Sequence, residues 1–125
     1  MLIASAIYGA LATVALVLAS PWLPSVFGDD FAGTSHYLLL LSPWPLFYAC
    51  KVAFATQLTG AGKQGARAII ETGGVAVAAL TGWAMIASHG PEGAAVALLV
   101  AEASMVTAMA LYQRGGSRAE TERAR

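Results

Sequence analysis

Long apolar runs separated by short polar turns are the dominant pattern of this chain. The four longest runs cover residues 2–20, 36–58, 66–88 and 93–113. A helix needs about 20 consecutive apolar residues to cross the hydrocarbon core of a bilayer. A segment exposed to lipid must also satisfy its own backbone hydrogen bonds, as a helix does. The pattern therefore predicts an all-α, polytopic membrane protein with four transmembrane helices.

Prolines interrupt this pattern in two places. The segment 21–31 contains two prolines and a turn-forming stretch at residues 28–30, so we predict that it stops the first helix and forms an interfacial linker. Within the second run, Pro43 and Pro45 remove backbone donors and bend a helix, which makes them hinge candidates. A simple packing bend is the alternative interpretation of these two residues.

Glycine-rich polar turns separate the last three runs. Residues 60–67 form the first turn, and their glycine–lysine spacing does not match a nucleotide-binding phosphate loop. The second turn, residues 89–93, combines glycine and proline, and Glu92 lies in the first turn of the next helix, where the helix dipole favours an anion. The polar residues 115–125 are expected to form a disordered tail.

Small residues recur on one face of the third run. Gly74, Ala78 and Gly82 are spaced four residues apart, which places them on the same side of a helix. Such a face lets the backbone of a second helix approach closely. We therefore predict a helix-packing contact along these three residues, with no chemical role.

Three charged side chains lie inside the apolar runs and away from the polar turns: Lys51, Glu71 and Glu102. A charge near the centre of a membrane helix costs at least about 2.5–3.5 kcal/mol, so such residues are candidates for a transport pathway. Lys51 and Glu71 lie on helices joined by a short turn, and a structural ion pair between them is plausible. Glu102 has no evident partner in the sequence. It is expected to be a neutral carboxyl bonded between helices, to face a polar cavity, or to meet a partner from helices outside this chain.

Composition supports the membrane interpretation and excludes several function classes. Hydrophobic residues make up 58% of the 125 residues and charged residues only 11%, against about 25% charged residues in soluble domains. A formal net charge of zero gives no reason to expect nucleic acid as a partner. No spacing typical of a metal or cofactor site, and no nucleophile with a nearby base, is present, so we expect neither a cofactor nor an enzyme. A single cysteine, Cys50, excludes a disulfide within the chain.

The basic residues are distributed unevenly over the polar segments. They follow the second and fourth runs, as Lys63, Arg67, Arg114, Arg118, Arg123 and Arg125. The opposite side would carry only Asp29, Asp30 and Glu92. Because cytoplasmic loops are enriched in lysine and arginine, we predict an inner-membrane protein with a cytoplasmic C-terminus.

Four stretches, taken in order, resemble one family of transporters. They are Leu23-Pro-Ser-Val-Phe-Gly-Asp-Asp-Phe31, His36-Tyr-Leu-Leu-Leu-Leu-Ser-Pro43, Leu58-Thr-Gly-Ala-Gly-Lys63, and Gly90-Pro-Glu-Gly-Ala-Ala-Val-Ala97 followed by Glu102. Together they resemble the C-terminal part of polysaccharide-biosynthesis membrane proteins. These are the lipid-linked oligosaccharide flippases of the multidrug/oligosaccharidyl-lipid/polysaccharide exporter superfamily.

The resemblance implies a fragment of a two-lobed transporter, equivalent to the last four helices of the C-terminal lobe. The implied partners are membrane lipid, a lipid-linked oligosaccharide that crosses by alternating access, and the remaining helices of the transporter. No fixed motif of the family assigns a role to a particular residue. Lys51, Glu71 and Glu102 therefore remain pathway candidates because of their burial alone.

Other functions remain open from the sequence. One is a multidrug exporter of the same superfamily, driven by an ion gradient. Another is a small four-helix transporter that assembles with copies of itself, in which Glu102 would meet its symmetry mate. A third is a membrane anchor or subunit that transports nothing.

Overall fold

The computed structural model describes residues 2–28 and 32–123, and within them it contains helices and short connections but no strand. The all-α class predicted from the sequence is therefore confirmed. The elements are α1 (Leu2–Ala19), the 3₁₀-helix η1 (Ser20–Trp22), α2 (Leu23–Phe27), α3 (Ala32–Leu41), α4 (Trp44–Gly60) and α5 (Gln64–Arg123).

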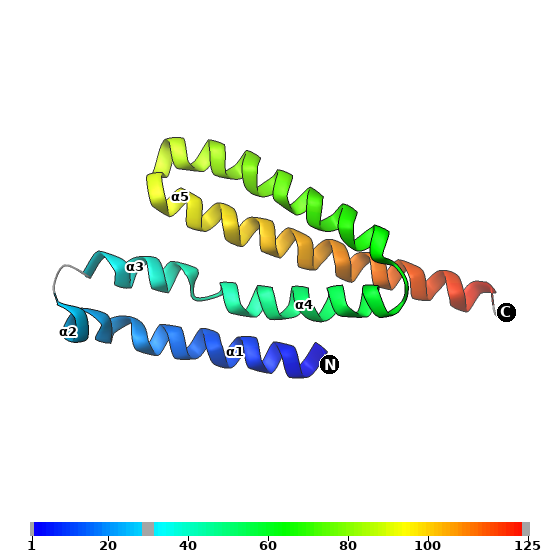
Figure 1. The fold of residues 1–125 in the computed structure, drawn as a ribbon, viewed down its shortest axis with the longest axis horizontal. Helices are drawn as coiled ribbons and strands as arrows, with labels where there is room; N and C mark the ends of the chain where they lie inside the picture. Colours follow the sequence, from blue (N-terminus) through cyan, green and yellow to red (C-terminus); the bar gives the residue numbers. More distant parts are fainter. Residues whose placement is uncertain (1, 29–31, 124–125) are drawn as a thin grey trace.

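Three helical segments of the described chain are long and apolar enough to cross a membrane. They cover Leu2–Phe27, Gly33–Gly60 and Gln64–Gly116. The third segment is long because it contains a sharp reversal at Gly90, where φ is 58° and ψ is −137°. Figure 1 shows that α5 folds back on itself there, so we distinguish a first arm (residues 64–89) from a second arm (residues 91–123). Only glycine adopts this backbone conformation without strain.

Helix α4 lies in the middle of the bundle. It packs against α1 on one side and against α5 on the other, and the second arm of α5 runs beside it (Figure 1). Helix α1 approaches α4 closely at Gly9, where an added Cβ would lie 2.8 Å from the Cα of Leu46. On the other side of α4, the buried residues Ala55, Leu58 and Met109 form a small core between α4 and the second arm.

The two arms of α5 meet through small residues. An added Cβ at Gly74 would lie 2.3 Å from Met105, and one at Gly93 would lie 2.2 Å from the carbonyl oxygen of Met85. Gly82 faces Ala97, with 3.9 Å between an added Cβ and the Ala97 Cβ. Such contacts allow the hairpin of α5 to close tightly, because no side chain keeps the two backbones apart.

The prolines of segment 21–31 do not end the helical conformation, contrary to the sequence-based prediction. The chain continues from α1 through η1 into α2, with a proline in the first turn of each short helix. Proline is tolerated there because the first-turn N–H groups have no partner within the helix. The turn predicted at residues 28–30 lies mostly outside the described residues. Reciprocal hydrogen bonds between Ser20 and Ser35, each from Oγ to the other's carbonyl oxygen, join the end of α1 to α3.

The second run is divided by its prolines into α3 and α4. The buried Ser42 donates its Oγ hydrogen bond to the Leu39 carbonyl at 2.8 Å, and Pro43 stands immediately before α4. Pro45 then occupies the first turn of α4. The break thus lies at the residues that the sequence marked as hinge candidates.

The C-terminal segment differs from the disordered tail that we expected. Helix α5 continues to Arg123, and residues 124–125 lie outside the described part of the chain. The alanine, glutamate and arginine residues of this segment have high helix propensity, and this propensity favours a helix even though the segment is polar.

Candidate functional site

The most buried of the ion pairs found in the described residues joins α4 to the second arm of α5. The Lys51 Nζ donates to the Glu102 Oε1 at 2.7 Å. Only 17% of the Lys51 side chain and 6% of the Glu102 side chain are exposed. The Lys51 ammonium also lies 4.9 Å from the centre of the Tyr48 ring, one helical turn earlier on α4. A charge-assisted hydrogen bond and a cation–π contact therefore hold the same ammonium group.

Glu71 has a different partner, on its own helix. Arg67 donates from Nε to the Glu71 Oε1 at 2.9 Å and from a terminal nitrogen to the Thr59 Oγ1 at 3.1 Å. This pair is more accessible than the first, with 40% and 39% of the two side chains exposed. Arg67 and Glu71 lie one turn apart on the first arm, a spacing that brings such side chains together on a helix.

The sequence-based pairing was therefore wrong on two points. Lys51 pairs with Glu102 instead of Glu71, and Glu102 has its partner within this chain. The physical reason is the reversal at Gly90, which brings the second arm of α5 beside α4. Glu71 needs no distant partner because Arg67 lies four residues away.

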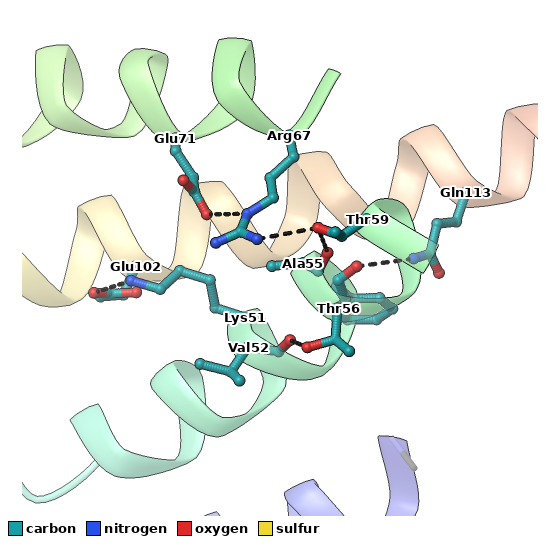
Figure 2. Close-up of polar contacts among 10 residues, drawn as sticks. Lys51, Val52, Ala55, Thr56, Thr59, Arg67, Glu71, Glu102 and Gln113 are labelled. Atoms are coloured by element: carbon teal, nitrogen blue, oxygen red, sulfur yellow. Dashed lines mark hydrogen bonds and ion pairs between the residues drawn. The ribbon is translucent and has the colours of Figure 1, made fainter. Parts of the chain in front are cut away.

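Both ion pairs line one cavity of about 470 Å³ between α4 and the two arms of α5. Figure 2 shows Lys51 reaching from α4 toward Glu102, with Arg67 and Glu71 on the neighbouring arm. The remaining wall is largely apolar and includes Gly74 and Ala78, from the small-residue face. Two cations and two carboxylates thus surround a cavity whose other surface is mostly hydrocarbon.

One polar atom of this cavity has an unmet hydrogen-bonding capacity. The Glu102 Oε2 is buried, and no residue in the described part of the chain donates a hydrogen bond to it. Leaving a buried acceptor without a donor costs about 1–3 kcal/mol, and more when the group is charged. The sequence marked Glu102 as a candidate, but it gave no sign that one of its oxygens would be paired and the other unpaired.

A second hollow, of about 610 Å³, lies beside the first, between α1 and α4. Its aromatic lining consists of Tyr8, Trp44 and Tyr48, and the Trp44 and Tyr48 rings are stacked with 5.0 Å between their centres. Tyr48 and Val52 line both hollows. Sequence analysis missed this groove because its walls come from helices separated by the whole linker segment.

The two ends of the bundle carry different polar contacts. At one end, His36 Nε2 lies 3.2 Å from Glu92 Oε1, and both side chains are exposed. At the other end, the Lys63 ammonium lies 5.8 Å from the centre of the Tyr112 ring. Over residues 2–28 and 32–123, no three histidine, cysteine or acidic side chains lie close enough together to hold a metal ion.

No protein family, curated protein or solved structure matched this chain in the comparisons made. We therefore infer the function from the geometry of the cavity and the chemistry of its lining.

Proposed function

We propose that this chain is a membrane-embedded part of a flippase or exporter that moves a lipid-linked oligosaccharide across the inner membrane by alternating access. The observation that carries the proposal is the cavity containing the Lys51–Glu102 and Arg67–Glu71 pairs. Ionisable residues within apolar helices are expensive and usually mark a substrate or ion pathway. A mostly apolar wall with a few convergent polar groups is also the usual character of a ligand site.

In this proposal the chain crosses the membrane four times, with the two arms of α5 as separate crossings. The reversal at Gly90 supports this count, because it lies between two arms that are each long enough to span a bilayer. The proposed orientation has the C-terminus in the cytoplasm. The position of Lys63 supports this orientation. Its ammonium lies close to Tyr112 and Gly116, so the turn before α5 and the basic end of the second arm lie at the same end of the bundle. Basic residues at one end favour the cytoplasmic side for that end.

Further helices are part of the proposal, either from a larger transporter or from a second copy of the chain. They would cover the open side of the cavity and complete a passage for the substrate. Exposed apolar side chains on the first arm, among them Ile69, Leu80 and Trp83, offer a surface that lipid or such helices can cover.

The test is surface-polysaccharide assembly in cells that express the protein from its own reading frame. We expect deletion of the gene to abolish assembly and to leave the lipid-linked oligosaccharide on the inner leaflet. The double variant Lys51→Met/Glu102→Gln, which leaves no unpaired charge, should reproduce this defect at normal protein levels. Normal assembly in the deletion strain would refute the proposal, and a changed resistance to drugs in that strain would favour the multidrug exporter instead.

A matched control is available on the exposed face of the first arm. Trp83 is 85% exposed and lies outside both hollows. The variant Trp83→Leu keeps an apolar side chain there, so we expect it to support normal assembly. Loss of assembly in this control would indicate that the assay reports on membrane insertion or on helix contacts at this face, and not on the cavity.

A further inference from the structure

We infer that the basic end of the bundle holds a binding site for the phosphate of an anionic phospholipid, supplied by the surrounding bilayer. The site is a hollow of about 400 Å³, the Arg114 hollow, which is lined by Leu2, Phe54, Ala110, Gln113 and Arg114. It shares no residue with the Lys51–Glu102 cavity or with the groove between α1 and α4. The lipid belongs to the membrane and is not a transported molecule, so this site goes beyond the proposed function.

The Arg114 hollow lies where three helical segments meet. Leu2 begins α1, Phe54 belongs to α4, and the other lining residues belong to the second arm of α5. Gln113 joins two of these segments, because its Nε2 donates to the Phe54 carbonyl oxygen at 3.4 Å. A ligand that fills the hollow therefore contacts all three segments and stabilises their meeting point.

The hollow lies at the depth of lipid headgroups. Leu2 begins the first membrane-length segment, and Arg114 lies two residues before Gly116, where the third such segment ends. The headgroup region of a bilayer begins where the hydrocarbon core ends. Tyr112, which is 44% exposed, adds an aromatic ring of the kind enriched at this depth. A phospholipid beside these helices therefore has its phosphate at the level of Arg114.

The charge of the lining favours an anion. Arg114 contributes a positive charge, and none of the described residues that line the hollow is acidic. The Lys51–Glu102 cavity differs, because two carboxylates balance its two cations. Basic pockets between membrane helices are typical sites for phosphate-bearing headgroups. A zwitterionic headgroup fits less well, since its ammonium finds no carboxylate among these lining residues.

The polar groups of the hollow match the oxygens of a phosphate. Arg114 is exposed, and a guanidinium presents five N–H donors in a fork that fits two phosphate oxygens at once. The Gln113 amide has two N–H groups, of which one donates to Phe54 and leaves the second for a phosphate oxygen. The apolar residues Leu2 and Ala110 contact hydrocarbon. That contact favours a lipid over a free phosphate, which carries no hydrocarbon.

The experiment is native mass spectrometry of the full chain in detergent micelles, titrated with dioleoyl phosphatidylglycerol or dioleoyl phosphatidylcholine. These lipids have the same acyl chains, and only the first carries a net negative charge. We expect the first molecule of phosphatidylglycerol to bind about tenfold more tightly than phosphatidylcholine, the effect of one charge-assisted hydrogen bond. The variant Arg114→Gln should remove this difference. Equal affinity of the wild-type protein for the two lipids would overturn the inference.

A matched control separates the hollow from the general positive charge of this end. Lys63→Gln also removes one positive charge, but Lys63 lies beside Tyr112 and outside the hollow. We expect it to keep the preference for phosphatidylglycerol. Arg114→Lys, which keeps the charge and loses the fork, should bind phosphatidylglycerol more weakly than wild type and still prefer it. Equal losses in Arg114→Gln and Lys63→Gln, or no preference in Arg114→Lys, would overturn the inference.

Two further measurements identify the ligand as a lipid and place it on the folded protein. Phosphatidylglycerol should raise the unfolding temperature of wild-type protein and of Lys63→Gln, and it should not raise that of Arg114→Gln. Soluble glycerol phosphate carries the phosphate without acyl chains, and at millimolar concentration it should not displace the lipid. Displacement by glycerol phosphate would overturn the assignment to a lipid, and an equal rise in unfolding temperature for Arg114→Gln would overturn the assignment to this hollow.

Discussion

Removing one partner of the Lys51–Glu102 pair should destabilise the protein far more than removing both. In the single variant Lys51→Met, the Glu102 carboxylate loses its only hydrogen-bond donor among the described residues, and 6% of its side chain is exposed. Leaving one charge of a buried pair without its partner costs about 3–5 kcal/mol. Because 17% of the Lys51 side chain is exposed, we expect Glu102→Gln to cost less, near the lower end of that range.

The double variant Lys51→Met/Glu102→Gln leaves no unpaired charge at the site. Replacing a buried ion pair by uncharged residues of similar volume is often neutral or stabilising. We therefore expect the double variant to be more stable than Lys51→Met, which gives a double-mutant cycle with a large coupling free energy. The measurement is the free energy of unfolding in detergent micelles, titrated with sodium dodecyl sulfate.

The Arg67–Glu71 pair serves as the control for this cycle. Its side chains are 40% and 39% exposed, so they are less desolvated than the side chains of Lys51 and Glu102. An exposed pair spaced four residues apart on a helix contributes about 0.3–0.5 kcal/mol, and we expect Glu71→Gln to cost less than about 1 kcal/mol. Equal costs for Glu71→Gln and Lys51→Met would refute the reasoning, because burial would then have no bearing on the strength of the pairs.

Three further outcomes follow from the fold. Gly74→Ala should lower the free energy of unfolding by about 1–3 kcal/mol, because the new Cβ meets Met105 at 2.3 Å. Its control, Gly73→Ala, has open space around the new Cβ and should raise the free energy of unfolding by about 0.5–1 kcal/mol. Gly90→Ala should cost about 1–3 kcal/mol in the same sodium dodecyl sulfate titration, since φ is 58° there, and Gly115→Ala is its unstrained control. A fusion of alkaline phosphatase to the C-terminus should be inactive and a fusion of green fluorescent protein should be fluorescent; the reverse pattern would contradict the proposed orientation.

The sequence predicted the helical class because hydropathy acts locally. Each apolar run is long enough to demand a helix in a lipid environment, whatever surrounds it. The course of segment 21–31 was predicted less well, since the effect of a proline depends on its position in a helix. Pro21 and Pro24 fall in first turns, where they cost no hydrogen bond, and the chain remains helical.

The ion pairs show where sequence reasoning reached its limit. Lys51 and Glu102 are separated by 51 residues, and only the reversal at Gly90 and the packing of α4 bring them together. The pairing of Arg67 with Glu71 was accessible from the sequence, because four-residue spacing on a helix is a local signal. Glu71 was predicted to pair with Lys51 because a short turn joins their helices, but Arg67 lies nearer to it on its own helix. The unpaired oxygen of Glu102 is a property of side-chain geometry and had no counterpart in the sequence.

The most direct test of the account is a flipping measurement in vesicles. The protein is reconstituted with a fluorescent lipid-linked oligosaccharide, and a membrane-impermeant quencher reports the fraction of fluorophore that reaches the outer leaflet. We expect wild-type protein to expose the inner-leaflet pool to the quencher, and we expect the double variant Lys51→Met/Glu102→Gln to do so no faster than protein-free vesicles. A Lys51→Met/Glu102→Gln variant that equalises the two leaflets at the wild-type rate would contradict the claim that the buried pair belongs to the transport pathway.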